Sequence, residues 1–313
     1  MMELVGNDGG VMEDERHTAA RDTAAKICVI FATRGRPEVL KSAVRLIDLQ
    51  TVKPDMIIVS CVSDEDAGHV RSRSDVLVVK GKPGLTSQRN NGLRHMPADM
   101  DFVIFLDDDF LTQETWIEEV LRVFEQDRTV SCITGKLLAD GIKGPGYTVD
   151  EGLALLSGST LPPTRLVSVP LDGPYGCNMA FRVASIEGIE FDERLVLYGW
   201  QEDRDFGAQV AKRGGRTVWI NTALGVHLGT KGGRVSGRRL GYSQVINPFY
   251  LLGKGSMTAG QALDHAGRNL VSNFLRSFVS EPYVDRFGRL RGNLIGLCDL
   301  VRGKLTPERA ERL

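Results

Sequence analysis

The chain lacks the features that mark several familiar classes of protein. Its five cysteines are widely spaced among 313 residues and include no Cys-x-x-Cys pair, which argues for reduced residues in a cytoplasmic protein and against a disulfide framework. No apolar run approaches the roughly 18 residues needed to span a bilayer. The formal net charge of -1 provides no general attraction to nucleic acid. What remains is an ordinary globular composition, 42% hydrophobic and 25% charged.

Three parts of the chain differ in their pattern. Residues 1–25 are polar and acidic with no apolar core, so they predict a disordered tail rather than a signal peptide. From residue 26 to residue 250, apolar strand-like runs alternate with amphipathic helices, which favours an α/β domain whose mainly parallel sheet is flanked by helices. Residues 251–313 predict a helical C-terminal extension that contains two amphipathic helices.

The predicted strands indicate where a ligand would bind, because open α/β sheets bind ligands beyond the carboxyl ends of their strands. Apolar runs of the buried-strand type cover residues 27–33, 56–62, 75–79, 102–106 and 130–134. Helices are expected to begin near Pro37, Thr86, Gln113 and Glu202. A strand is expected at 217–220, before a loop rich in Gly and Arg that continues through Gly241.

An acidic triplet, Asp107, Asp108 and Asp109, directly follows the fourth predicted strand. Three adjacent carboxylates repel one another and raise one another's pKa values unless a positive charge compensates them. Mg²⁺ or Mn²⁺ would do so, because both bind hard oxygen ligands. In an extended segment Asp107 and Asp109 point to one side and Asp108 to the other, so the first and third are candidate metal ligands. The alternative is helix capping, but Thr112 is better placed for that task.

A second acidic pair, Glu202 and Asp203, stands at the start of a predicted helix. Acidic side chains favour helix N-termini, which alone would explain the pair. The catalytic alternative is that one of them removes the proton from an attacking hydroxyl group. Asp203 is then the candidate general base, while Glu202 supports it or binds the acceptor.

Several other segments stand out in the same region. They are the opening strand with Thr33-Arg34, then Gln88-Arg-Asn-Asn-Gly92, Phe105-Leu-Asp-Asp-Asp109, Gly176-Cys-Asn-Met-Ala-Phe-Arg182, Gln201-Glu-Asp-Arg-Asp205 and Val226-His227. In this order and spacing they resemble the GT-A glycosyltransferases of family 2, from about Lys26 to Tyr250. The chain after Tyr250 lies outside the resemblance.

The resemblance implies a GT-A fold and the transfer of a sugar, with inversion, from a nucleoside-diphosphate sugar to an acceptor hydroxyl. Mn²⁺ or Mg²⁺, held by Asp107, Asp109 and His227, would bind the diphosphate, and Asp203 would act as the base. The donor would be a UDP-, GDP- or dTDP-sugar, and the acceptor a carbohydrate, a lipid-linked sugar or a small molecule. The residues expected to bind the nucleotide sugar are Thr33, Arg34, Asp64, Arg89, Asp107, Asp108 and Asn178.

Two alternative functions are compatible with part of the pattern. A sugar-phosphate nucleotidyltransferase uses a related sheet and Mg²⁺, but it would need a Gly-rich phosphate-binding loop, whereas residues 33–37 contain one glycine. A nucleotide-sugar-binding protein without turnover is disfavoured, because the acidic triplet and the Glu202–Asp203 pair are both present.

The last predicted helix carries an apolar stripe. Leu290, Leu294, Leu297, Val301 and Leu305 follow one another at spacings of three and four, with basic residues on either side. Buried stripes are commoner than stripes that lie on membranes, so we expect this one to pack on the catalytic domain or on a second subunit, as in a homodimer. The alternative is peripheral contact with an anionic membrane.

Overall fold

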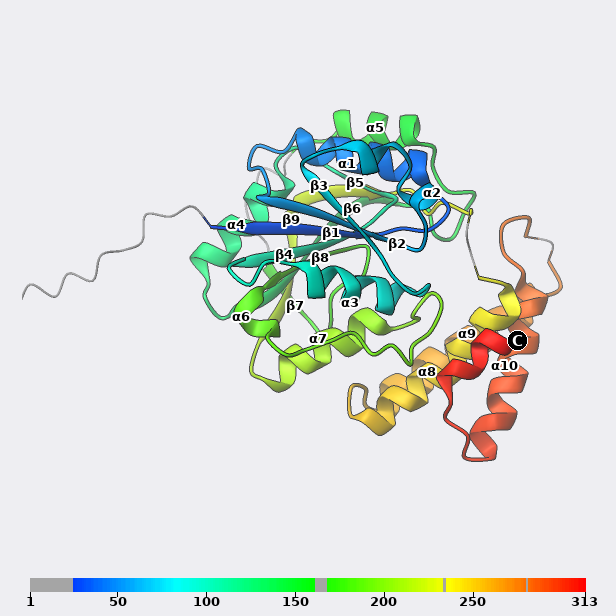
Figure 1. Cartoon of the computed structure of the whole chain (residues 1–313). Coiled ribbons are helices and arrows are strands. Elements are labelled where there is room, and N and C mark those ends of the chain that lie inside the picture. Colours follow the sequence, from blue (N-terminus) through cyan, green and yellow to red (C-terminus); the bar gives the residue numbers. More distant parts are fainter. Residues whose placement is uncertain (1–24, 161–167, 233–234, 280) are drawn as a thin grey trace, which may run out of the picture.

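The computed structural model describes residues 25–160, 168–232, 235–279 and 281–313. The expected disordered tail, residues 1–25, lies outside this part of the chain apart from its last residue. Within the described residues a nine-stranded sheet forms the centre, helices cover both of its faces, and a group of C-terminal helices projects from one side (Figure 1). The strand order is β3-β2-β1-β4-β8-β6-β9-β5, and β7 pairs with β9.

The elements alternate along the chain as the sequence predicts. The strands are β1 (Ile27–Ala32), β2 (Met56–Cys61), β3 (Val76–Lys80), β4 (Phe102–Asp107), β5 (Phe110–Thr112), β6 (Val130–Asp140), β7 (Ser168–Leu171), β8 (Asn178–Arg182) and β9 (Arg216–His227). The longer helices are α1 (Pro37–Asp48), α3 (Leu85–His95), α4 (Trp116–Gln126), α5 (Val149–Ser157), α7 (Glu202–Lys212), α8 (Gly237–Lys254), α9 (Ala259–Arg276) and α10 (Arg286–Val301). Short helical turns are α2 (Asp64–Ala67), η1 (Gly68–Ser72), α6 (Val183–Ile186) and η2 (Pro307–Arg312).

The sheet is mixed. Strands β3, β2, β1 and β4 run parallel, and so do β6 and β9. Strand β8 runs antiparallel to both β4 and β6 and joins these two groups, while β5 and β7 run antiparallel to β9. The α/β fold class with a mainly parallel sheet and a helical C-terminal region is therefore confirmed.

Burial on both faces explains why the first strands are continuously apolar. In β1, Ile27, Val29 and Phe31 pack into one core, whereas Cys28 and Ile30 pack into the other. Side chains of α1 and α4 complete the first core, and side chains of α3 and α7 complete the second. With both faces covered, the edge at the carboxyl ends of the parallel strands is where polar side chains gather.

Thr112 does not cap a helix, contrary to the expectation from the sequence. It ends the short strand β5, and α4 begins at Trp116. The side chain of Gln50 serves the start of α4 instead: its Oε1 accepts a hydrogen bond from Ile117 N at 3.0 Å, and its Nε2 donates to Thr112 Oγ1 at 3.1 Å. A cap supplied by a residue that follows α1 leaves no local signal in the sequence.

Strand β9 is longer than predicted, and helix α8 was not predicted. Strand β9 continues beyond the expected 217–220 to His227, because β5 and β6 both pair with its second half. The Gly- and Arg-rich loop ends early, because α8 begins at Gly237, where the Ser236 hydroxyl accepts a hydrogen bond from Arg239 N. Helix α8 also crosses the predicted boundary between residues 250 and 251.

Helix α8 connects the sheet region to α9 and α10. Asn247 on α8 donates to the carbonyl of Trp200 at 2.9 Å, and Lys254 pairs with Asp205 at 2.6 Å. The two expected amphipathic helices are present as α9 and α10. The apolar stripe of α10 packs only in part: Leu294 and Val301 are 51% and 88% exposed, whereas Leu305 packs beside Tyr242 and Ile246 of α8. Packing of the exposed part on a second subunit stays a prediction.

Gly225 on β9 permits the close approach of β5 that brings Asp109 and His227 together. A Cβ atom at this position would lie 2.1 Å from Cζ of Phe110. We therefore expect Gly225→Ala to lower the free energy of unfolding by about 1–3 kcal/mol in urea denaturation. Gly144→Ala is the control, because a Cβ there meets no atom within 4 Å. Equal effects of the two substitutions would contradict this interpretation.

Candidate active site

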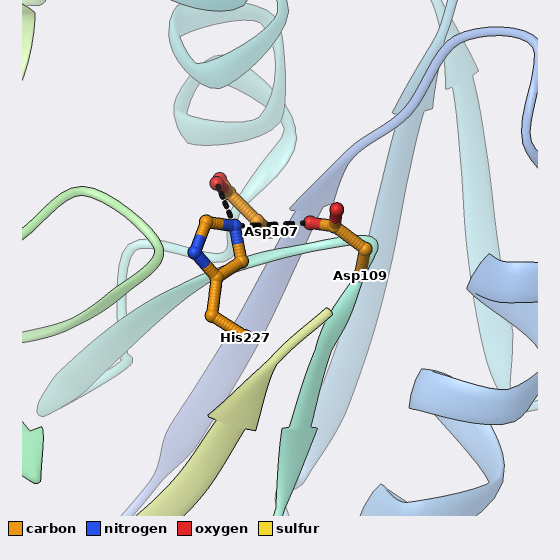
Figure 2. Close-up of side chains that lie close together, drawn as sticks. All are labelled: Asp107, Asp109 and His227. Carbon is orange, nitrogen blue, oxygen red and sulfur yellow. Dashed lines mark ion pairs between the residues drawn. The ribbon is translucent and has the colours of Figure 1, made fainter. Parts of the chain in front are cut away.

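The expected metal ligands converge where β4, β5 and β9 meet (Figure 2). Asp107 ends β4, and Asp109 lies in the turn that leads into β5. Strand β5 pairs with β9 so that Phe110 stands opposite His227, and the carbonyl of Asp109 accepts a hydrogen bond from Leu228 N at 2.9 Å. The pairing of this short strand therefore carries His227 to the acidic triplet.

The side chains of Asp107, Asp109 and His227 face one another. One ligand atom from each of them lies within 4.8 Å of the others. His227 Nε2 is 3.4 Å from Asp109 Oδ1 and 4.0 Å from Asp107 Oδ2, the two ion pairs drawn in Figure 2. On the other side of the ring, Nδ1 lies 2.9 Å from Asp140 Oδ1, which fixes the orientation of the imidazole. The sequence does not identify Asp140, because its place depends on the register of β6 against β9.

The second oxygen of each ligand carboxylate is held by an arginine. Asp109 Oδ2 lies 3.1 Å from Arg36 Nη1 and also accepts a hydrogen bond from Thr230 N at 2.8 Å. Asp107 Oδ1 accepts a hydrogen bond from Arg89 Nη2 at 3.0 Å. Each carboxylate is therefore fixed through one oxygen, while its other oxygen faces His227 Nε2.

The crowded acids control the protonation of the cluster. Burial lowers the pKa of His227, but hydrogen bonds to Asp109 and Asp140 outweigh it and raise the pKa to about 10. Burial alone would raise the pKa of Asp109, yet His227 and Arg36 hold that pKa well below its ordinary value. Burial raises the pKa of Asp107, and the charge of Arg89 offsets only part of this effect. The carboxylates of the cluster therefore favour a positive charge at the His227 ring.

Asp108 lies with Asp109 in the turn after β4, and its side chain takes no part in the cluster of Asp107, Asp109 and His227. It is fully buried: Thr33 Oγ1 donates to its Oδ2 at 2.7 Å, and Arg36 Nη2 lies 2.7 Å from its Oδ1. Burial raises the pKa of Asp108 to about 7, against the opposing charge of Arg36. Arg36 thus pairs with both Asp108 and Asp109. It was not among the residues expected from the sequence, although it lies in the same loop as Thr33.

Arg89 connects the acidic triplet to the Glu202–Asp203 pair. Its side chain is 2% exposed, and its Nη1 lies 2.5 Å from Glu202 Oε1. Its Nη2 bonds to Asp107 and, at 2.7 Å, to the carbonyl of Gly176. The guanidinium therefore donates to three protein acceptors, the Glu202 and Asp107 carboxylates and the Gly176 carbonyl.

Asp203 lies at the start of α7, beside an open pocket. Its Oδ2 accepts a hydrogen bond from Gly176 N at 2.8 Å, and its Oδ1 accepts one from Arg204 N at 2.7 Å. Gln201, which precedes α7, has a φ angle of 72°, a left-handed conformation that is costly for a non-glycine residue. The pocket has a volume of about 130 Å³, and its lining includes Arg204 and, from α9, His265.

The remaining expected residues lie around this centre. Arg34 is exposed in the loop after β1, and Asp64 begins α2 after β2, 3.2 Å from the Lys80 ammonium. Asn178 is fully buried in β8, and its Oδ1 accepts a hydrogen bond from Gly135 N at 2.6 Å. The structure therefore brings Asp107, Asp109 and His227 into direct contact and places Arg34, Asp64 and Asn178 outside that cluster.

Removal of the Arg89 charge should destabilise the fold. In Arg89→Met, the carboxyls of Asp107 and Glu202 lose their shared cation, so we expect a loss of about 3–5 kcal/mol in the free energy of unfolding at about pH 8. Burial raises the pKa values of both carboxyls and Arg89 lowers them, so without Arg89 these pKa values rise further in the folded state. The folded variant then binds more protons than the folded wild type, and the loss should shrink toward about pH 5.

The control for this prediction is Arg94→Met on the same helix. The Arg94 side chain is 51% exposed and pairs with Glu193 at 3.3 Å, so its removal should change stability by less than about 1 kcal/mol. Urea denaturation at both pH values measures the two effects. A loss in Arg89→Met that is small, or that grows as the pH falls, would refute the ionic role of Arg89.

Comparison with known proteins identifies the family and the fold. Residues 28–188, about half of the chain, match the family described as Glycosyl transferase family 2. Among curated proteins, none matches the sequence significantly. The crystal structure of S. aureus TarS 1-349 is similar with a TM-score of 0.55 and 14% identity, over 92% of this chain and 83% of that one. A second crystal structure of S. aureus TarS has a TM-score of 0.51 and 15% identity, over 82% of this chain and 44% of that one.

At these identities the likeness to TarS concerns the fold, which is the GT-A fold expected from the sequence. The family match covers β1 to β4 and extends through β8, so it includes the acidic triplet. This chain belongs to glycosyl transferase family 2 and is a glycosyltransferase of the GT-A fold.

Proposed function

We propose that the protein transfers a sugar from a nucleoside-diphosphate sugar to an acceptor hydroxyl, with a divalent cation on the diphosphate and with inversion at the anomeric carbon. The observation that supports this most strongly is the link through Arg89, which binds Asp107 of the acidic cluster and Glu202 beside Asp203. The site for the diphosphate and the site for the base would therefore lie on either side of one buried guanidinium. A nucleotidyltransferase would not need the second of these.

The donor set of the cluster fits Mn²⁺ or Mg²⁺. Two carboxylate oxygens and one imidazole nitrogen face one another, and the nitrogen favours Mn²⁺. The arginines on the far oxygens hold the carboxylates in place, and Asp140 would hold Nδ1 of a neutral His227. When bound, the cation would stabilise the negative charge of the departing nucleoside diphosphate.

The donor nucleotide would lie along the carboxyl edge of β1, β2 and β4. Arg34 and Asp64 are accessible there and would contact the nucleoside of a UDP-, GDP- or dTDP-sugar. Thr33 and Asp108 would shape the floor through their mutual hydrogen bond. Arg89 and Asn178 are buried and already bonded to protein groups, so they would position the donor site rather than touch the nucleotide.

Asp203 would act as the general base for the acceptor. It would take the proton of the attacking hydroxyl while the acceptor oxygen bonds to the anomeric carbon and the bond to the diphosphate oxygen breaks. Attack from the side opposite the leaving group gives inversion. Two backbone donors, Gly176 N and Arg204 N, hold the carboxylate of Asp203, and the pocket next to it would admit the acceptor.

Metal binding is tested by titrating Mn²⁺ into the protein with UDP or GDP present. Asp109→Asn should abolish the metal-dependent gain in nucleotide affinity, because it removes a ligand charge. Asp140→Asn should weaken Mn²⁺ about 10–100-fold, because it frees the His227 ring. The control is Asp75→Asn, an exposed residue that pairs with Arg73. Wild-type Mn²⁺ and nucleotide affinity in Asp109→Asn would remove the metal site from this proposal.

The base is tested by the release of nucleoside diphosphate from a panel of sugar nucleotides with hydroxyl acceptors. Asp203→Asn should lower kcat by about 10²–10⁴-fold, the usual effect of losing a general base. Donor affinity should stay within about twofold of wild type, because Asp203 lies on the acceptor side of Arg89. Glu190→Gln, a substitution of an exposed residue, is the control. A near-normal kcat, or a loss of donor binding, would assign Asp203 another role.

A further inference from the structure

The interior of the bundle of α8, α9 and α10 contains three buried amide side chains. Gln244 on α8, Asn273 on α9 and Asn293 on α10 are each at most 2% exposed. Asn273 Nδ2 donates to both Gln244 Oε1 and Asn293 Oδ1 at 2.9 Å, and Asn293 Nδ2 donates to the carbonyl of Gly241 at 2.7 Å. Amide side chains therefore occupy the place that leucines fill in an ordinary helical bundle.

Glycines bring α10 against α8. A Cβ atom at Gly241 would lie 2.0 Å from the carbonyl oxygen of Arg289, and one at Gly292 would lie 2.1 Å from that of Arg238. Gly292, Asn293 and Gly296 are the buried side of α10. Small and polar residues face the bundle, whereas Phe287, Leu294 and Val301 of α10 are exposed.

The outward sides of α9 and α10 are apolar. On α9 the exposed residues are spaced along one face, opposite the buried Ala262, Ala266 and Asn273. On α10, Phe287 and Leu294 lie opposite the glycines. Because α9 and α10 both pack on α8 and touch each other, as Figure 1 shows, these faces lie on the outer side of the bundle. The α9–α10 apolar surface consists of Val271 (56% exposed), Phe274 (51%), Leu275 (61%), Phe278 (78%), Phe287 (62%) and Leu294 (51%).

The part of the chain that carries this surface is rich in basic residues. Residues 259–304 contain seven Lys and Arg against four Asp and Glu, a formal charge of +3 in a chain whose total is -1. One of the four acids, Asp299, is buried, whereas Arg268, Arg276, Arg291, Arg302 and Lys304 are exposed. Two copies joined through this side would bring like charges together, whereas an anionic surface would attract it.

We propose that the α9–α10 apolar surface docks on an anionic lipid bilayer. The aromatic and leucine side chains would enter the boundary between headgroups and acyl chains, and the arginines would meet the lipid phosphates. Among the described residues no helix is long and apolar enough to cross a membrane, so the contact would lie along the surface. Because His265 on α9 also lines the pocket beside Asp203, docking would hold the proposed acceptor pocket close to the lipid; this last step rests on the proposed function.

The test is sedimentation of the full chain with vesicles of phosphatidylcholine alone or of equal parts phosphatidylcholine and phosphatidylglycerol. We expect binding to the anionic vesicles that weakens in high salt. The charge variant Arg291→Gln/Arg302→Gln should bind more weakly by about 5-fold for each charge removed. It keeps the apolar side chains, so it tests the proposal even if an apolar variant folds poorly.

The apolar variant is Phe274→Ser/Phe278→Ser, and it should lose vesicle binding. Its matched control is Leu153→Ser/Leu155→Ser on α5, which also replaces two exposed apolar residues but lies above the sheet in Figure 1. Equal binding to both vesicle types, or an equal loss in the control, would overturn the proposal. So would light scattering that shows a dimer lost in the Phe274→Ser/Phe278→Ser variant together with no vesicle binding, because a second copy would then cover the surface.

Discussion

Three adjacent carboxylates at the end of a buried strand need nearby positive charge to remain ionised. Much of the site supplies that charge. Arg89 binds Asp107, Arg36 binds Asp108 and Asp109, and His227 faces the remaining oxygens. The compensation comes from three directions: α3, the loop after β1, and the end of β9. It fixes the carboxylates yet leaves one oxygen of Asp107 and one of Asp109 directed at a common point.

The same charges tie the two halves of the site together. The desolvation penalty of burying the Arg89 charge would be large for an ion pair with Asp107 alone. Arg89 also pairs with Glu202 at the start of α7, which offsets more of this penalty. That contact links the acidic cluster to Glu202, the chain neighbour of Asp203, on a different element. In the proposed reaction this coupling would keep the base aligned with the leaving diphosphate.

Much of the fold follows from local patterns that the sequence displays. Apolar runs locate β1 to β4, and the place of the acidic triplet directly after β4 is visible in the sequence. Local patterns do not reveal how segments that are distant in the sequence pair with one another. Strand β5 is only three residues long and forms by pairing with β9. Asp140 contacts His227 because of the register between β6 and β9. The same limit explains the wrong expectation for Thr112, whose capping task falls to Gln50.

The C-terminal helices show a different limit. Periodicity correctly predicts amphipathic helices, but it does not say which side faces the protein. Glycines and amides take the inner side of α10, so Leu294 and Val301 of the leucine stripe are exposed, whereas Leu305 packs beside Tyr242 and Ile246. Gly292 and Gly296 mark the inner side of the helix in the sequence. Their role can be recognised only from the structure, in which α8 approaches α10 closely at Gly241.

The central claim, that Asp107, Asp109 and His227 hold a cation on the donor diphosphate, is tested most directly by electron spin-echo spectroscopy of Mn²⁺ bound with a nucleoside diphosphate. We expect a nitrogen coupling from a directly bound imidazole and a phosphorus coupling from the diphosphate, with the nitrogen signal lost in His227→Gln. A Mn²⁺ spectrum with neither coupling, or a nitrogen coupling unchanged in His227→Gln, would contradict it.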